Sequence, residues 1–302
     1  MRKVIYTIAT AIIFSLAFTS CEEKNGNGNG NGYENGNGIR KLPSRIVLTN
    51  PDFPDETGTW TFRYDEQNRM TEFRQEWETD WDTSGIICTI EYDANNKVSK
   101  ITHTRFRKNP WNDFLNYYYT DVYTFQHIGN QVHITAVGFG YSGRMTLNAN
   151  GQITRWEWET DMVFTYTNEN LTQIKVAQGE TVDFSYSNVL NIFRNVASPD
   201  WLMLFSDGLV LYFPPSRYMP SKVMVVDGSW EEIVAFTYQT DSNGWVTSST
   251  GTPTGTNFEH YSSRTNNSRF LGETSRFGVR NQASARNNAE TWFMTFEYVL
   301  AR

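Results

Sequence analysis

Hydrophobic and polar side chains alternate with a period of two along most of the chain after Arg40. Successive side chains of a β-strand point to opposite faces, so this alternation predicts strands with one buried face. Aromatic and β-branched residues, which favour strands, fill many of the apolar positions. The clearest alternating sets are Trp60, Phe62 and Tyr64; Ile90 and Tyr92; Tyr123 and Phe125; Phe164 and Tyr166; Phe184 and Tyr186; Phe236 and Tyr238.

Residues typical of hairpin turns follow most of these strands. Segments 64–70, 92–98 and 147–153 share one form, with an Asp or Asn at the first turn position. Such a side chain accepts hydrogen bonds from the main chain of its own turn. Asn68, Asn96 and Gly151 stand where a type I turn with a bulge requires a positive φ. The pattern predicts antiparallel hairpins.

Longer sequences recur as well. Glu-Trp-Glu-Thr-Asp occurs at 76–80 and again at 157–161, each time after a predicted hairpin. Pro-Ser-[Arg/Lys]-[Ile/Val] occurs at 43–46 and 220–223, each time upstream of an aromatic strand. Because the copies recur in matching positions, they indicate repetition. We predict an all-β fold, a repetitive antiparallel β-meander that forms a large curved sheet or an open barrel.

One segment departs from this pattern. Ser198, Pro199 and Asp200 supply an N-cap, a proline at the first helical position and an acid in the first turn. Gly208 would end the helix. The apolar residues between them are Trp201, Leu202, Leu204 and Phe205. We therefore predict one short helix that covers part of a sheet face.

The first residues form a different kind of segment. Arg2 and Lys3 precede an apolar run at 4–18, which leads through Thr19 and Ser20 to Cys21. This order is typical of a lipoprotein signal peptide that is cleaved before an acylated cysteine. The apolar run is shorter than the roughly 20 residues of a membrane-spanning helix. We predict a signal peptide at 1–20 and lipidation, for example with palmitate, at Cys21.

The mature chain divides into two parts. Residues 21–39 comprise the lipidated cysteine and a tract of mostly Asn and Gly, which we expect to be a disordered tether because it buries too little to offset its chain entropy. Residues 40–302 are expected to form a single β-rich domain. Within it, 250–290 is rich in Ser, Thr, Asn, Gly and Arg, and we predict a mobile polar loop there. A last strand through Trp292 and Tyr298 follows.

Several of these features together resemble a known group of proteins. The Pro-Ser-[Arg/Lys]-[Ile/Val] openings, the Phe-x-Tyr-Asp turns, the central apolar helix and the closing aromatic strand resemble uncharacterised Bacteroidetes-type surface lipoproteins with YD-like aromatic β-hairpin repeats. The resemblance covers residues 40–302 and implies an all-β lipoprotein with no assigned catalytic residues. Glu22 and Glu23 resemble the acidic export signals of such proteins, which implies an outward-facing position on the outer membrane.

Charge and cysteine content narrow the choice of partners. Without Arg2 and Lys3 the mature chain has 24 basic and 33 acidic residues, a net charge of about −9. Such a surface repels nucleic acid. Cys88 is the remaining cysteine, so no disulfide framework is expected. The histidines have no spacing typical of a metal site, and we expect no metal and no cofactor; they are His103, His127, His133 and His260.

Two apparent catalytic motifs lack the required context. Residues 138–143 match G-x-G-x-x-G, but no helix pattern follows that would bind a phosphate at its N-terminus. We expect a glycine-rich bend instead. Cys88 lies in a strand pattern between Ile87 and Ile90, which is typical of a small buried residue rather than a nucleophile. The sequence shows no catalytic site, and we expect binding rather than catalysis.

The repeated acidic segment supplies the remaining candidates for a site. Exposed indole rings stack on sugars, and carboxylates beside them accept hydrogen bonds from hydroxyl groups. In the alternative interpretation the indoles belong to the core and the acids to a solvated face. The candidate ligand-binding residues are Trp77, Trp81, Trp156, Trp158, Glu157 and Glu159.

We therefore expect a lipid-anchored, extracytoplasmic binding or interaction module whose ligand is a glycan or another envelope protein. Two alternatives stay open, a hydrolase of extracellular polymer and a structural or assembly lipoprotein. An open aromatic surface would favour a glycan, and two carboxylates in one site would favour hydrolysis. A free strand edge would favour a protein partner.

Overall fold

A computed structural model describes residues 40–51, 53–138, 140–158, 160–205, 212–228, 230–254 and 291–301. These residues are mostly strands. The strands are β1 (Lys41–Asn50), β2 (Phe53–Tyr64), β3 (Met70–Glu78), β4 (Thr83–Tyr92), β5 (Val98–Lys108), β6 (Tyr117–Ile128), β7 (Gln131–Val137), β8 (Ser142–Leu147), β9 (Ile153–Glu157), β10 (Asp161–Thr167), β11 (Asn170–Val176), β12 (Thr181–Leu190), β13 (Tyr218–Asp227), β14 (Trp230–Thr240), β15 (Val246–Pro253) and β16 (Trp292–Leu300). Two short 3-10 helices, η1 (Asp113–Leu115) and η2 (Asp200–Phe205), complete the described elements.

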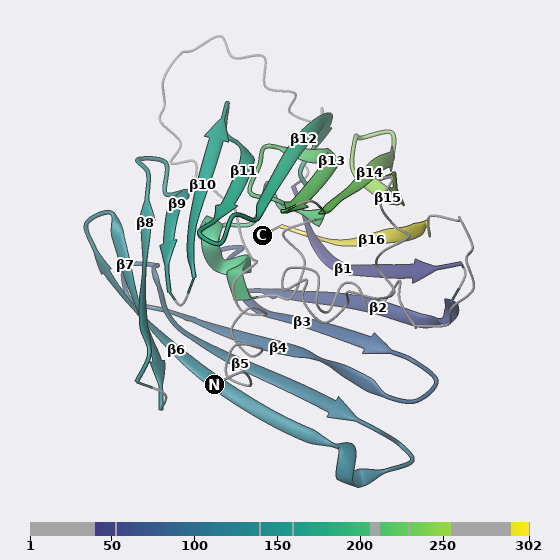
Figure 1. The fold of residues 1–302 in the computed structure, drawn as a ribbon, viewed down its shortest axis with the longest axis horizontal. Coiled ribbons are helices and arrows are strands. Elements are labelled where there is room, and N and C mark those ends of the chain that lie inside the picture. The colour runs from purple at the N-terminus through teal and green to yellow at the C-terminus, as the bar shows by residue number, and fades with distance from the viewer. Residues whose placement is uncertain are drawn as a thin grey trace.

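The strands form one antiparallel sheet that closes into a barrel (Figure 1). Each strand pairs with the next along the chain, and β16 pairs with β1, where Ile46 lies opposite Phe296. The predicted all-β meander is confirmed, but the barrel is closed rather than open. In the described part of the chain every strand pairs with two neighbours, but residues 117–121 of β6 pair with β5 alone, because the pairing of β6 with β7 begins at Val122.

The two ends of the barrel differ in what they connect. The β2–β3, β4–β5 and β14–β15 turns lie at the same end as the start of β1 and the finish of β16, because Lys41 lies opposite Leu300. We call this the tether end, since the predicted tether precedes β1. The opposite, distal end carries the β3–β4, β5–β6 and β9–β10 loops.

Most apolar side chains face the inside of the barrel, and most charged side chains face outward. Along β4, Ile86, Cys88 and Ile90 are buried, whereas Thr89 and Glu91 are exposed. Ion pairs between strands on the outside include Arg45–Glu297, Lys100–Glu91 and Arg144–Glu157. A barrel that crosses a bilayer has the reverse arrangement, with an apolar band outside and a polar interior.

The predicted hairpin turns are confirmed at the tether end. Asp65 Oδ1 accepts hydrogen bonds from the main-chain N–H groups of Gln67 (2.9 Å) and Arg69 (3.0 Å). Asp93, Asn148 and Asp241 make the same pair of contacts in their turns. The φ angles are 60° at Asn68, 61° at Asn96 and 79° at Gly151, as the turn chemistry predicts.

Tyrosines in the second half of the aromatic strands have a role that the sequence pattern did not show. Each hydroxyl donates a hydrogen bond to a carbonyl at the start of the preceding strand. The pairs are Tyr64 to Pro43 (2.7 Å), Tyr92 to Met70 (2.8 Å), Tyr186 to Leu171, Tyr238 to Pro220 (2.5 Å) and Tyr298 to Val246 (2.8 Å). On β6, His127 takes this place, with Nε2 2.8 Å from Val98 O. The tyrosine and histidine side chains thus provide hydrogen-bond partners for main-chain carbonyls at the starts of strands.

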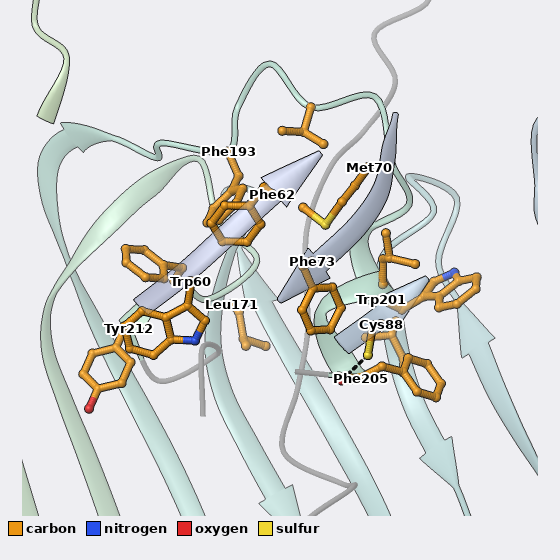
Figure 2. Close-up of a cluster of buried hydrophobic side chains, with 14 of the residues drawn as sticks. Trp60, Phe62, Met70, Phe73, Cys88, Leu171, Phe193, Trp201, Phe205 and Tyr212 are labelled. Atoms are coloured by element: carbon orange, nitrogen blue, oxygen red, sulfur yellow. Dashed lines mark hydrogen bonds between the residues drawn. The ribbon is translucent and has the colours of Figure 1, made fainter. Parts of the chain in front are cut away.

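Between β12 and β13 a longer segment replaces the short turn that other hairpins have, and its described residues, 191–205 and 212–217, fold back into the barrel. We call these described residues the plug. Figure 2 shows Phe193, Trp201 and Phe205 of the plug beside side chains of β2, β3 and β4. The plug rings contact strands on several sides of the barrel, in the pairs Phe193–Phe62 (5.1 Å), Trp201–Phe125 (5.0 Å) and Phe213–Phe296 (5.9 Å between ring centroids). The plug completes the core.

The short covering helix predicted here is wrong. Residues Asp200–Phe205 form a 3-10 helix within the barrel, not an α-helix over a sheet face. The Ser198 hydroxyl accepts a hydrogen bond from Met70 N (2.7 Å), and Phe205 O accepts one from Cys88 Sγ (3.1 Å). These contacts with β3 and β4 hold both ends of the segment, and tertiary contacts override a weak local preference for α-helix.

Some predictions fall partly or wholly outside the described residues. The signal peptide, Cys21 and the tether lie there, as do residues 255–290 of the predicted polar loop. The strand β15 extends to Pro253, so the first residues of the predicted loop 250–290 are strand rather than loop. The predicted closing strand is confirmed as β16, which contains Trp292 and Tyr298.

Candidate functional site at the distal end

The repeated tryptophans Trp77 and Trp158 occupy equivalent places at the distal end. Each indole lies against a glycine of the preceding strand, Gly58 or Gly143. A Cβ at either glycine would fall 1.8 Å or 2.1 Å from the ring, so the pairing requires glycine. Trp292 covers Gly251 in the same way. All three tryptophans are half-buried and pack against the core.

The other predicted residues are distributed over three locations. Trp156 is 3% exposed and stacks on Trp158 at 5.9 Å, so it belongs to the core. Trp81 lies in the β3–β4 loop and is 57% exposed. Glu157 lies on the outer face, where it pairs with Arg144 (2.6 Å) and Arg155 (3.5 Å). Glu159 is outside the described residues. Glu157 therefore does not share a face with the tryptophans.

A different set of polar residues lies on the inner face of β5 and β6. The register places His103 and Arg105 of β5 opposite Asp121 and Tyr119 of β6. Tyr123 follows on the same face of β6, and its ring centroid is 6.1 Å from that of Trp158. We call these five residues, His103, Arg105, Tyr119, Asp121 and Tyr123, the distal cluster. It combines hydrogen-bonding groups of several kinds with the Tyr123 ring, which contacts Trp158.

Burial shifts the pKa values of the titratable groups in this cluster. Desolvation raises the pKa of Asp121, while a hydrogen bond with Tyr119 and the nearby Arg105 guanidinium act to lower it. Desolvation, with a smaller contribution from Arg105, lowers the pKa of His103 to about 3, so the imidazole is neutral at physiological pH. His103 is 4% exposed, and its Nδ1 has no hydrogen-bond partner among the described residues.

An unpartnered buried nitrogen is unusual, because most buried polar atoms are hydrogen-bonded. His103 Nδ1 is therefore available for a hydrogen bond, and it lies on the same face as Asp121. Gln75 on the inner face of β3 has a similar feature, since it is 1% exposed and its Oε1 lacks a partner in the described structure. The inner face at the distal end thus carries polar groups that the protein itself does not satisfy.

A half-buried carboxyl group, Glu232, lies on the other side of the barrel. Glu232 of β14 alternates with the inward-facing Val234 and Phe236, and desolvation raises its pKa to about 7. Its charge also contributes to the raised pKa of Tyr212 in the plug, for which desolvation is the main cause. A carboxyl group with such a pKa can donate a proton near neutral pH.

The β5–β6 loop exposes three large apolar residues that were not among the candidates predicted from the sequence. Phe114 is 100% exposed, Trp111 78% and Leu115 44%. We call these three residues the tip. The tip joins β5 to β6 (Figure 1), at the end of β6 that continues past its pairing with β7. The signal in the sequence was the presence of large apolar residues in the polar turn segment 109–116, where turn chemistry does not require them.

The glycine-rich segment and Cys88 have the structures that the sequence predicts. Gly138 and Gly140 have φ angles of 92° and 68° and lie in the β7–β8 connection, which confirms the glycine-rich bend. Cys88 is buried, as predicted. Within the described ranges, no group of three or more His, Cys, Asp or Glu side chains is placed to bind a metal. Among those same residues, no helix has the length and apolar character needed to span a membrane.

The chain is similar to several solved structures, of which two are porin-like proteins of Bacteroides. A porin-like protein from Bacteroides uniformis has 14% identity and a TM-score of 0.38, covering 85% of this chain and 96% of its own. A porin-like protein from Bacteroides vulgatus has 9% identity and a TM-score of 0.37, covering 86% of this chain and 99% of its own. No family model and no curated protein sequence matches the chain. The function has to be inferred from the chain's own residues.

Proposed function

We propose that this protein is a lipid-anchored envelope protein that binds a carbohydrate through the distal cluster. The observation that carries the proposal is the placement of Arg105, Asp121 and the unpartnered His103 Nδ1 on one face of β5 and β6 together with Tyr123, whose ring centroid lies 6.1 Å from that of Trp158. Sugars present apolar ring faces and many hydroxyl groups. Aromatic planes and fixed donors and acceptors on one face complement both features.

The proposed anchor and the proposed site lie at opposite ends of the barrel. The start of the barrel at Lys41 lies at the end opposite the distal cluster. Acylation at Cys21, as the sequence predicts, would therefore attach the protein to the outer membrane by its tether end and direct the distal cluster away from that membrane. The charged outer face supports anchoring by lipid rather than by the barrel wall.

Hydrolysis of a carbohydrate polymer is the second candidate. The observation that favours it is Glu232, an inward-facing carboxyl group with a pKa of about 7, because a glycosidase needs a general acid that holds its proton at neutral pH. Glu232 and Asp121 lie on β14 and β6, far apart in the order of strands around the barrel. Binding without turnover is therefore our first candidate.

Glycan-array binding followed by calorimetry tests the proposal. Asp121→Asn removes a charged acceptor while keeping the shape, and we expect it to weaken binding about tenfold or more without lowering the melting temperature. Glu157→Gln on the outer face is the matched control and should bind like the wild type. Absence of carbohydrate binding by the wild type, or equal affinities of the two variants, would contradict the proposal. Release of reducing sugar that Glu232→Gln abolishes would establish the hydrolase instead.

A further inference from the structure

The distal cluster is one end of a longer row of side chains. On β6, Tyr117, Tyr119, Asp121 and Tyr123 share the inner face, since the pairing with β5 continues without a register shift. The row spans about 20 Å at the rise of a β-strand. It becomes more exposed away from the core, from 7% at Asp121 to 39% at Tyr119 and 50% at Tyr117. The exposed length exceeds one sugar ring.

The charges along this row are compensated by partners. Arg107, which lies opposite Tyr117, donates from Nε to Asp82 Oδ2 at 2.6 Å. Arg105 lies opposite Tyr119 and interacts electrostatically with Asp121. A polyanion needs uncompensated cations, which these arginines do not offer. The row instead offers tyrosine rings and their hydroxyl groups, and its charged groups are already paired. Such a surface suits an uncharged polar chain.

The hairpin that carries the row is held in shape by its own side chains. Asn109 Oδ1 accepts a hydrogen bond from Trp111 N (2.9 Å), and Asn112 Oδ1 accepts one from Phe114 N (3.1 Å). Asn116 Oδ1 accepts from Asn109 N (2.5 Å). These contacts fix the loop before any ligand binds. A preordered surface avoids the entropy cost of ordering on binding.

We infer that the ligand is an uncharged polysaccharide chain that lies along the inner face of β5 and β6 from Tyr123 to Tyr117. The inference rests on the proposed function and specifies its substrate class, a polymer rather than a free sugar. Tyr117 contacts the part of the chain farthest from the distal cluster. Its contribution therefore depends on the length of the ligand, whereas that of Asp121 does not.

Affinity electrophoresis in gels that contain mannan, xylan, mixed-linkage β-glucan, dextran or polygalacturonate identifies the polymer. Calorimetry with mono-, di-, tetra- and hexasaccharides of the retained polymer then measures length dependence. We expect the hexasaccharide to bind most tightly, and Tyr117→Ala to weaken its binding about tenfold while leaving monosaccharide binding unchanged. Tyr118→Ala, which removes a 63% exposed ring from the opposite face, is the matched control and should change neither.

The outcomes separate the inference from the proposed function. If mono- and hexasaccharides bind equally, or if Tyr117→Ala and Tyr118→Ala have equal effects, the polymer inference is wrong and the sugar site stands. Retention by polygalacturonate alone would overturn the uncharged class. If no carbohydrate is bound and a protein from the envelope binds in a manner that Tyr117→Ala abolishes, both the inference and the proposed function are wrong.

Discussion

The tether end and the distal end of the barrel differ in how completely their buried polar groups are hydrogen-bonded. At the tether end, turn acids accept from the main chain, tyrosine hydroxyls meet carbonyls, and the plug is tied down by Ser198 and by Asn195, whose Nδ2 donates to Lys41 O (3.0 Å). At the distal end, Gln75 Oε1, His103 Nδ1 and Trp292 Nε1 are buried without a partner in the described structure.

The exposure of apolar residues shows the same contrast. The plug rings Phe193 and Trp201 are each 1% exposed, whereas Trp111 and Phe114 at the distal tip are largely exposed. A buried unpartnered atom destabilises a folded chain, and an exposed ring gains no stability from burial. Proteins commonly accept such groups where a site needs them and obtain stability elsewhere. On the proposed function, the tether end supplies stability and the distal end carries the binding site.

The largest expected effect comes from the plug. Trp201→Ala leaves a cavity beneath Phe125 and should lower the free energy of unfolding by about 3 to 5 kcal/mol. Trp111→Ala makes the same chemical change at the exposed tip and should cost less than about 0.5 kcal/mol. Denaturant unfolding of both variants measures the contrast. Similar losses would mean that the tip contributes to folding and that the two ends do not divide these roles.

A smaller effect is expected from Glu232, which lies in the distal half of β14. Its folded pKa of about 7 exceeds the ordinary value of 4.5, so the folded state holds the proton more tightly than the unfolded state. Stability should therefore fall as the pH rises from about 4.5 to 7, by up to about 3 kcal/mol. Glu232→Gln should raise the melting temperature above pH 7 and leave it unchanged below pH 4.5. An unchanged pH dependence in the variant would show that the buried charge is not destabilising.

Local features of the fold could be predicted from the sequence. Strands follow from alternation, and the Asp65 and Asp93 turns follow from side chains that bond their own main chain, so neighbouring residues determine both. Closure could not be predicted, because the β1–β16 pairing joins distant parts of the chain and depends on the stagger of the whole sheet. The local N-cap pattern at Ser198 was misleading, since its hydroxyl serves Met70 instead.

The candidate site was less predictable than the fold. The tryptophans of the repeat were found, but their glycine partners and the burial of Trp156 depend on register between strands. His103, Arg105 and Asp121 occupy positions in β5 and β6 that look like ordinary alternating strand. Their convergence beside Trp158 arises only when β5, β6 and β9 are placed around one interior.

The smallest expected effect concerns one turn of the tether end. Asn68 holds φ at 60°, a conformation that is strained for a β-branched residue and free for glycine. Asn68→Val should cost about 1 kcal/mol or more of unfolding free energy, and Asn68→Gly should change it by less than about 0.5 kcal/mol. Gln67→Val is the matched control, because Gln67 is an exposed neighbour in the same turn without a positive φ. Thermal unfolding of the three variants measures these differences. Equal tolerance of valine at positions 67 and 68 would show that the turn conformation contributes no stability, and it would weaken the assignment of the stabilising role to the tether end.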